Sequence, residues 1–339
     1  MYIILAILLF GLLIFIHELG HYITARIFNV AITEFSIGMG PKLISKVSPK
    51  TGITYSIRLL PIGGFVSMVG EDEESNHPNA FHKKPIWQRM IVCAAGSVSN
   101  VLLGFVVMFI LVTATPQLGT LQVASFPEGA TSNSFIEVDD IIKEVDGHNV
   151  HTLGELNYFI NRYGSEPVNM TVERAGSKII LENVVFPTTI QSGHVFGLRD
   201  FYVYVAEKNF GTIIKNGFYQ ALLTIRTVFD SIYDLITGTY GVEDLSGPVG
   251  VVNVISTSAK NDSYQLWSIF VLLAMNLGIM NLLPIPALDG GRMLMLIIEG
   301  IIKRPLNKNI EGYINFVGII LLFGLMIFIT IKDIFQLIV

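Results

Sequence analysis

The chain has 339 residues, of which 51% are hydrophobic and 14% charged, with a formal net charge of −5 and a mean hydropathy of +0.58. This composition is typical of membrane proteins. The acidic balance argues against nucleic acid as a partner, because nucleic acid is bound by basic surfaces. The single cysteine, Cys93, stands in an apolar run, which excludes an internal disulfide and a cysteine-based zinc site.

Four apolar segments are long enough to cross a lipid bilayer as helices, which takes roughly 20 residues. They cover residues 2–25, 90–114, 265–283 and 313–331. No basic residue precedes the first segment and no small-residue cleavage site follows it before His17, so we expect a retained helix rather than a cleaved signal. The predicted fold class is therefore an α-helical polytopic membrane protein with four transmembrane helices.

Lysine and arginine residues gather in two connecting segments, 26–89 and 284–312. The positive-inside rule places both segments in the cytoplasm. The two termini and the long segment 115–264 then lie outside the cell. We thus expect a multi-pass protein of the cell (plasma or inner) membrane.

The segments between the predicted helices differ in pattern. Residues 32–70 alternate and are punctuated by glycine and proline, which predicts a membrane-associated strand hairpin. Residues 115–200 predict a small β-rich domain, with a strand over 140–145, tight turns at 146–147 and 175–176, and one amphipathic helix. Residues 201–264 are amphipathic, and we expect helices there, with a turn or a helix start at 246–250.

Ionisable residues stand together at the end of the first apolar segment, where residues 17–21 read HELGH. Residues four apart share one face of a helix, so His17 and His21 can offer two imidazole nitrogens to one metal ion. Glu18 is placed to act as a general base beside that ion. The alternative is a chance match where the helix leaves the membrane, but such groups are costly beside hydrocarbon. The pattern therefore predicts a zinc site.

A catalytic zinc ion takes three protein ligands and keeps one open position. Asp289, in the segment NLLPIPALDGG (281–291), is the predicted third ligand. It follows the third helix on the same side of the membrane as the HELGH segment, and the surrounding prolines and glycines break the helix and let the backbone turn back. The alternative is that Asp289 caps the helix that follows it.

Three asparagines stand in the predicted membrane helices. Asn281 is a candidate for contact with a bound substrate, and helix–helix contact is an equally favoured interpretation. For Asn276 and Asn100, helix–helix contact is favoured. The small residues at 94–97 and 99 predict that helices approach closely beside Asn100.

These motifs together resemble the site-2 protease family of intramembrane zinc metalloproteases, in its bacterial branch of the regulator of sigma-E protease type. The family has HExxH in the first helix and N-x-x-P-x-P-x-L-D-G in the third, which stand here at 17–21 and 281–290. The cytoplasmic and second-helix segments and DDIIKEVDG (139–147) are also similar. The resemblance implies a protease core of residues 1–114 and 265–339, with the LDG motif at 288–290, one PDZ-like domain over 115–200, and an amphipathic helical region over 201–264.

The implied activity is hydrolysis of peptide bonds in the transmembrane segments of single-span proteins, such as anti-sigma factors or remnant signal peptides, in regulated intramembrane proteolysis. The implied cofactor is Zn²⁺, held by His17, His21 and Asp289, with Glu18 as the base. The other implied partner is the lipid bilayer.

A helical substrate must be unwound before attack, because its peptide bonds lie inside its own hydrogen-bond ladder. An extended segment can add to the edge of the 53–69 hairpin by main-chain pairing. Gly63, Gly64 and Phe65 are the predicted substrate-binding residues there, together with Asn281. A plain structural lid is the alternative role of this hairpin.

The PDZ-like domain has no G-L-G-F loop at its start, although GHVFGL (193–198) supplies such a loop if the domain is circularly permuted. A size-excluding gate is at least as well supported as peptide binding. Two other functions use the same residues. A zinc transporter would have no need of Glu18 as a base and tends to contain repeats, and none is found. An inactive PDZ membrane scaffold would not need the four site residues.

Overall fold

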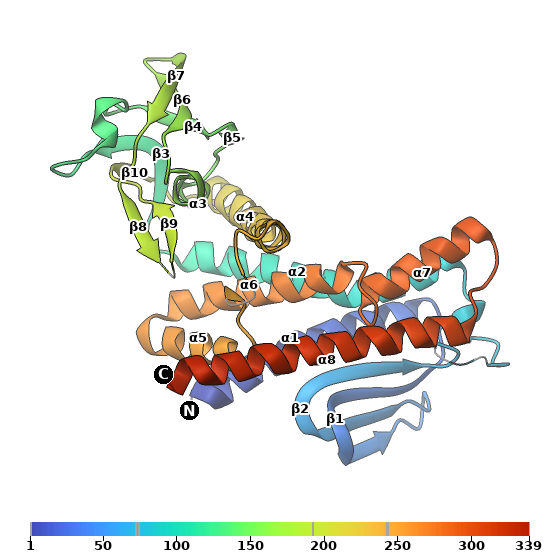
Figure 1. The fold of residues 1–339 in the computed structure, drawn as a ribbon. Coiled ribbons are helices and arrows are strands. Elements are labelled where there is room, and N and C mark those ends of the chain that lie inside the picture. The colour runs from blue at the N-terminus through green and yellow to red at the C-terminus, as the bar shows by residue number, and fades with distance from the viewer. Residues whose placement is uncertain (1, 72, 74, 192, 242–243, 339) are drawn as a thin grey trace. The chain divides into compact units, whose positions relative to one another are not determined.

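The computed structural model describes residues 2–71, 73, 75–191, 193–241 and 244–338 (Figure 1). The chain divides into two compact units, one formed by 1–104 and 227–339 and the other by 105–226. Each unit is described separately below.

Within the described residues, four helices are long and apolar enough to cross a membrane, which fits a polytopic membrane protein. They are α1 (Tyr2–Ile27), α2 (Ile86–Ala114), α6 (Ser263–Leu282) and α8 (Lys308–Ile338). The four predicted apolar segments are thereby confirmed as helices, although α2 begins four residues before the predicted start and α8 extends beyond both predicted ends. Hydropathy marks only the stretch that suits hydrocarbon, and a helix continues into polar turns such as the one with Gln88 and Arg89.

The first part of α2 packs tightly against α1 and α6. A Cβ atom on Gly20 of α1 would overlap the Ala95 carbonyl, and one on Gly278 of α6 would lie 2.7 Å from the Ser97 carbonyl oxygen. Such close backbone approach is the role of small residues between membrane helices. The predicted close packing beside Asn100 is confirmed.

The strands β1 (Ile32–Val47) and β2 (Thr54–Met68) form the predicted hairpin, and both strands bend. Residues 32–37 pair on one side with 64–68 and on the other with 54–57, while 42–47 pair with 54–58. The pairs recorded for 64–68 all run to 32–37, so this segment is an edge of the folded hairpin. Phe35 packs against Tyr22 of α1 with ring centroids 5.3 Å apart, which attaches the hairpin to the first membrane helix.

Three further helices are α4 (Phe210–Thr237), α5 (Pro248–Asn261) and α7 (Asp289–Ile302). The predicted helix start at 246–250 is confirmed by α5. Its N-terminus receives a side chain from the last membrane helix, because the Asp333 carboxylate accepts a hydrogen bond of 2.7 Å from the Gly250 N–H. Asp333 is only 3% exposed. Its side chain caps α5 from another helix of the same chain and so links α5 to α8.

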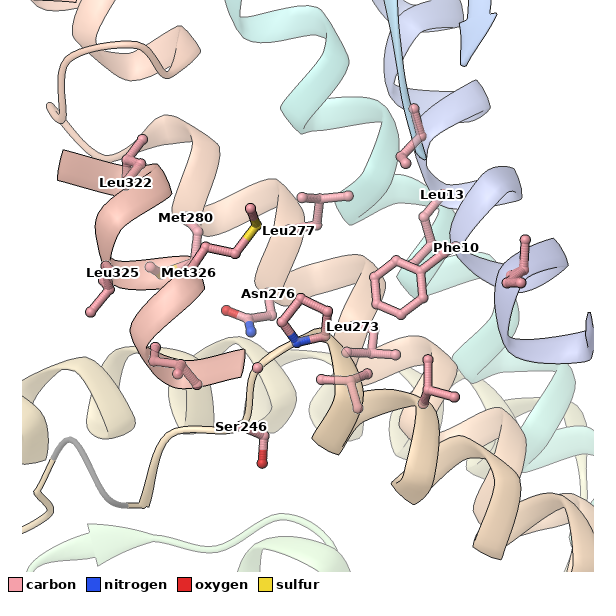
Figure 2. A pocket seen from close by; sticks show the side chains of 17 residues that line it. Phe10, Leu13, Ser246, Leu273, Asn276, Leu277, Met280, Leu322, Leu325 and Met326 are labelled. Atoms are coloured by element: carbon pink, nitrogen blue, oxygen red, sulfur yellow. The ribbon is translucent and has the colours of Figure 1, made fainter. Parts of the chain in front are cut away.

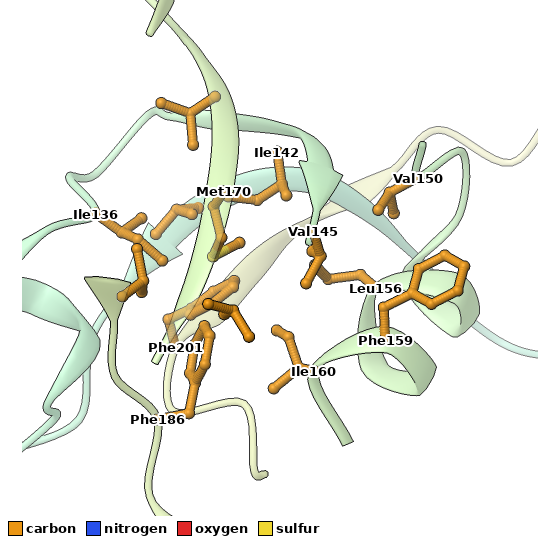
Figure 3. Packing of buried hydrophobic residues seen from close by; sticks show 14 residues of the cluster. Ile136, Ile142, Val145, Val150, Leu156, Phe159, Ile160, Met170, Phe186 and Phe201 are labelled. Carbon is orange, nitrogen blue, oxygen red and sulfur yellow. The ribbon is translucent and has the colours of Figure 1, made fainter. Parts of the chain in front are cut away.

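The second unit holds a sheet in the order β10–β3–β4–β6–β7, with β5 paired to β4, and a separate β8–β9 hairpin. The elements are β3 (Leu118–Ser125), β4 (Ile141–Val145), β5 (His148–Asn149), α3 (Leu153–Tyr163), β6 (Val168–Arg174), β7 (Ser177–Val184), β8 (Thr188–Gln191), β9 (His194–Gly197) and β10 (Tyr202–Ala206). Figure 3 shows the core, in which Leu156 and Ile160 of α3 face Val145 and Met170 of the sheet.

Both predicted turns of this domain are confirmed. Asp146 and Gly147 have φ angles of 47° and 75°, and Ala175 and Gly176 have φ angles of 50° and 79°, as two-residue hairpin turns of the primed type require. The expectation of helices throughout 201–264 was wrong at its start, because residues 202–206 form β10 and pair with β3. Alternating tyrosine and valine in this segment favour a strand.

Candidate metal centre

Two imidazoles project from neighbouring turns in the second half of α1. The His17 and His21 rings lie 4.8 Å apart between centroids, and their Nε2 atoms are separated by 3.2 Å. The helical period sets this spacing, because residues four apart lie one above the other. Two ring nitrogens that face one another at this distance are arranged to share a cation.

The Asp289 carboxylate completes a triangle with these nitrogens. Its Oδ2 atom lies 3.2 Å from Nε2 of His17 and 3.4 Å from Nε2 of His21. Asp289 is the first residue of α7, and Leu288 occupies the cap position without a side-chain cap hydrogen bond. The carboxylate therefore turns toward the imidazoles rather than capping its own helix.

Glycines let the chain between α6 and α7 fold tightly enough to bring Asp289 there. A Cβ atom on Gly290 would overlap the Leu282 and Leu283 carbonyls, and one on Gly291 would overlap the Ile285 carbonyl. Asn315 of α8 accepts a hydrogen bond of 3.3 Å from the Ala287 N–H. Asp289 thus reaches the site at the end of a short turn, and the hydrogen bond to Asn315 of α8 fixes the backbone of that turn.

The three atoms fit a tetrahedral zinc ion. Metal–ligand bonds of about 2.0–2.2 Å in a tetrahedron imply ligand–ligand distances of about 3.3 Å, and the observed separations are 3.2, 3.2 and 3.4 Å. Two imidazoles and one carboxylate are a usual catalytic zinc set that leaves a fourth position open. His17, His21 and Asp289 can thus hold zinc.

Outer hydrogen bonds orient both imidazoles. The His21 Nδ1–H donates to the Val92 carbonyl over 2.7 Å, which leaves Nε2 with a lone pair for the metal. The Nδ2 atom of Asn100 lies 3.4 Å from Nδ1 of His17, and its Oδ1 atom has no hydrogen-bond partner among the described residues. A half-turn of the amide brings this oxygen to the His17 Nδ1–H. Asn100 then accepts a hydrogen bond from the His17 ring, as the Val92 carbonyl does from the His21 ring.

Two more α2 residues contact the ligands. The Ser97 hydroxyl donates to Oδ2 of Asp289 over 3.3 Å, and Gly96 lies directly under the His21 ring. Burial of Asp289 opposes its ionisation, but the hydrogen bonds with His17 and His21 outweigh burial and hold its pKa below the usual range. The carboxylate is therefore the charged form that a metal needs.

A cavity of about 370 Å³ opens beside these residues and is lined by His17, Glu18, His21, Phe65, Arg292 and others. The Glu18 carboxylate receives a hydrogen bond from the Val66 backbone, so the 64–68 edge and Glu18 are neighbours. Gly64 makes this approach feasible, because a Cβ atom there would lie only 3.0 Å from Cγ of Glu18. The cavity thus joins the ligands, the predicted base and the strand edge.

The other predicted substrate residues are placed as follows. Phe65 lines the cavity under the Arg58 guanidinium, whose carbon is 4.8 Å from the ring centre. Gly63 has a φ of +85° and faces Met39. Asn281 lies in the last turn of α6, outside the lining of this cavity, so its substrate contact stays a prediction.

Sequence reasoning missed the contribution of Asn100, which was assigned to helix packing. A signal was present, since Cys93, Gly96, Ser97 and Asn100 recur three and four apart and form one small and polar stripe on an otherwise apolar span. A polar stripe in a membrane helix is a candidate site in its own right.

Comparison with known proteins agrees with this geometry. A family model described as peptidase family M50 matches residues 5–325. The chain is 34% identical to "Putative zinc metalloprotease CPE1693" of Clostridium perfringens over 98% of each chain. It is 30% identical to "Zinc metalloprotease RasP" of Geobacillus kaustophilus, over 97% of this chain and 96% of the relative. It is 27% identical to "Regulator of sigma-W protease RasP" of Bacillus subtilis over 97% of each. The triangle that His17 and His21 of α1 form with Asp289 of α7 could hold a metal ion, and the family match covers nearly the whole chain. The chain therefore belongs to peptidase family M50, the site-2 protease family of zinc metalloproteases.

Proposed function

We propose that this protein is an intramembrane zinc endopeptidase that cuts the transmembrane segments of single-span proteins, such as anti-sigma factors or remnant signal peptides, in regulated intramembrane proteolysis. The observation that carries the proposal is the triangle of His17, His21 and Asp289 beside Glu18. Both histidines and Glu18 belong to a helix apolar enough to span a membrane. The name of the Bacillus subtilis relative, "Regulator of sigma-W protease RasP", supports a substrate linked to sigma-factor regulation.

His17, His21 and Asp289 would hold the zinc ion, with Ser97, Asn100 and the Val92 carbonyl orienting them. When bound, zinc supplies a Lewis acid that polarises a carbonyl and lowers the pKa of water. Glu18 takes a proton from the attacking water and passes it to the leaving amine. The Val66 backbone holds the Glu18 carboxylate in place for this transfer.

An extended substrate segment would pair with the 64–68 edge of the hairpin. That edge carries Gly64 against Glu18 and Phe65 in the cavity, so a strand added to it passes the base and the metal ligands. Main-chain pairing holds a peptide in extended form without regard to most of its side chains. It also keeps the peptide bonds out of a helix, which hydrolysis requires.

An apolar cavity of about 540 Å³ in the same unit suits the part of the substrate that stays helical (Figure 2). Ile7, Phe10 and Ile14 of α1 line it, and their spacing puts them on the same stripe of α1 as Glu18. Asn276 stands among apolar side chains in this cavity. Such an amide can pair with a polar group of a substrate helix.

We further propose that the active site lies near the cytoplasmic side of the cell membrane, with both termini and the β-rich domain outside, as the distribution of basic residues favours. The β-rich domain is proposed to be PDZ-like and to act as a size-excluding gate. Gly197 of β9 supports the gate, because a Cβ atom there would overlap the Ile160 carbonyl at the end of α3, which leaves no room for a peptide between these two elements.

The test is co-expression of the wild type or Glu18→Gln with a panel of single-span membrane proteins, combined with metal analysis of the purified proteins. We expect Glu18→Gln to retain zinc and to lose about 10²- to 10⁴-fold in cleavage rate, so that uncut fragments accumulate. Glu128→Gln, at an exposed glutamate of the β-rich domain, is the matched control and should cleave normally. Unchanged cleavage by Glu18→Gln would contradict the proposal and favour a transporter or a scaffold.

A further inference from the structure

One face of α7 carries three charged residues that pair with three different parts of the protease core. Asp289, Arg292 and Glu299 recur three and seven residues apart, which places them on one face of the helix. Asp289 faces the imidazoles, Arg292 pairs with Glu71, which follows β2, and Glu299 receives both arms of Arg89 over 2.6 and 3.1 Å. Of these three residues, the proposed reaction uses only Asp289.

Arg292 stands between two cavities. It lines the metal cavity together with Glu18 and Asp289. It also lines a second cavity of about 450 Å³, which continues along α7 past Arg89 and Glu299. Glu71, Cys93 and Arg292 are common to both linings. The Arg292–Glu71 pair therefore stands where one cavity meets the other.

The Arg292 side chain keeps 31% of its surface accessible, whereas Glu71 keeps 13%. The guanidinium presents five N–H donors in a planar fork, and besides Glu71 the charge of Glu311 also acts on it. A carboxylate that arrives from the metal cavity can replace Glu71 at this fork. Arginine is the side chain best shaped for such paired recognition of a carboxylate.

Peptide hydrolysis creates a carboxylate at this place. The substrate enters as a neutral amide. Water adds its oxygen to the carbonyl carbon, the C–N bond breaks, and one water proton reaches the leaving nitrogen through Glu18. The second water proton is lost by the new carboxylic acid to the amine at neutral pH, so the products are one carboxylate and one ammonium group. Among the charged groups of the metal cavity, Arg292 is the cation that comes from the protein.

We propose that Arg292 is the binding site for the newly formed product carboxylate, with Glu71 as the resting counter-ion that the carboxylate displaces. This inference rests on the proposed peptidase function. Glu71 competes for the same guanidinium, so the product is held weakly and leaves into the second cavity, where Arg89 is already paired with Glu299. The exchange of one carboxylate for another keeps Arg292 neutralised throughout.

The test measures peptide binding to the full-length protein in detergent. Zinc-loaded Glu18→Gln protein is titrated with an acetylated pentapeptide of alanine and leucine, which ends either in a free carboxylate or in an amide. The measured quantity is the ratio of the two dissociation constants, amide over carboxylate, from isothermal titration calorimetry.

We expect this ratio to fall about tenfold when Arg292→Gln is added, since a charge-assisted hydrogen bond is worth about that factor or more. Glu71→Gln should lower the dissociation constant of the carboxylate peptide, because the competing group is removed. Arg304→Gln, at an exposed arginine outside both cavities, is the matched control and should leave the ratio unchanged. Any affinity of zinc for the carboxylate is common to all variants.

The inference is overturned if Glu18→Gln protein gives the same ratio with and without Arg292→Gln, at equal zinc content. Should Arg292→Gln lose zinc, Glu71→Gln and Arg292→Lys decide the matter. An unchanged dissociation constant of the carboxylate peptide in Glu71→Gln, or an unchanged ratio in Arg292→Lys, whose lysine lacks the planar fork, also overturns it. If the wild type cleaves membrane substrates but Arg292→Gln does not change the ratio, this inference alone is refuted. If the wild type cleaves no membrane substrate, the proposed function is refuted.

Discussion

Gly96 of α2 lies directly against the imidazole of His21, and a Cβ atom at position 96 would overlap Nε2, the nitrogen that faces the metal position. A residue of α2 therefore limits where the ring of His21, a predicted metal ligand on α1, can lie.

Gly96→Ala should weaken metal binding by about 10- to 100-fold, the range seen when groups that orient metal ligands are disturbed. The methyl group must displace either the ring or the helix. The measurement is a zinc titration against a competing chelator. Gly11→Ala is the control, because a Cβ atom at Gly11 in α1 meets nothing within 4 Å. Equal zinc affinity of the two variants would contradict the close contact.

Asn100→Leu should likewise reduce zinc affinity by about 10- to 100-fold. Asn100 is fully buried and its amide is within 3.4 Å of Nδ1 of His17, so its loss leaves that ring without an outer partner. Asn276→Leu replaces a comparable membrane asparagine that lines the apolar cavity instead, and its zinc affinity should match that of the wild type. If both variants bind zinc normally, Asn100 serves only helix packing.

Gly64→Ala should lower cleavage at least about tenfold while zinc content stays constant. The added methyl group would lie 3.0 Å from Cγ of Glu18 and 3.0 Å from the Ser36 carbonyl oxygen, so either the base or the strand edge must shift. Gly312→Ala, where the surroundings are open, provides the control. Loss of zinc together with activity in Gly64→Ala would show a wider disruption than this contact predicts.

The hairpin should lose stability in acid through Glu34. Burial opposes its ionisation, but hydrogen bonds from Ser56, Lys42 and Arg58 outweigh burial and lower the pKa of Glu34 to about 2. Because the pKa is lower in the folded state than in the unfolded state, this contribution is complete above the unfolded value of about 4.3 and is lost as the pH falls toward 2.

Hydrogen exchange of the 32–37 amides in the wild type and in Glu34→Gln, compared at each pH, measures this effect. The wild type should be better protected at pH 6, and the difference should shrink between pH 4 and pH 2. A difference that is constant across this range would exclude Glu34 as its source.

Asp333→Ala should loosen α5. The carboxylate caps this helix from α8 through the Gly250 N–H, and the loss of a cap costs about 1 kcal/mol. Amide exchange in residues 251–261 should therefore accelerate about five- to tenfold. Phe335→Ala, at an exposed position on the same helix turn, should leave exchange in α5 unchanged. Equal exchange in both variants would mean that the cap does not hold α5.

Features that depend on residues close in sequence could be predicted. The four spans follow from runs of apolar residues, and the pairing of His17 with His21 follows from the helical period, which acts over four residues. The turns at 146–147 and 175–176 were also predictable, because glycine and its neighbour accept positive φ angles. The strand β10 was not, since residues 202–206 lie next to amphipathic helical sequence and their state depends on pairing with β3.

The sequence by itself determined that this protein spans a membrane and carries a metal-binding motif, because both are set by local composition and period. It also named Asp289, but it left a ligand and a helix cap as alternatives. Only the tertiary structure decided that Asp289 turns to the imidazoles, that Asn100 and Gly96 on α2 orient them, and that Arg292 meets Glu71 between two cavities. These contacts join residues that are about 70 to 270 positions apart. Small residues mark where helices can approach closely, but only the tertiary structure decides which segments meet there.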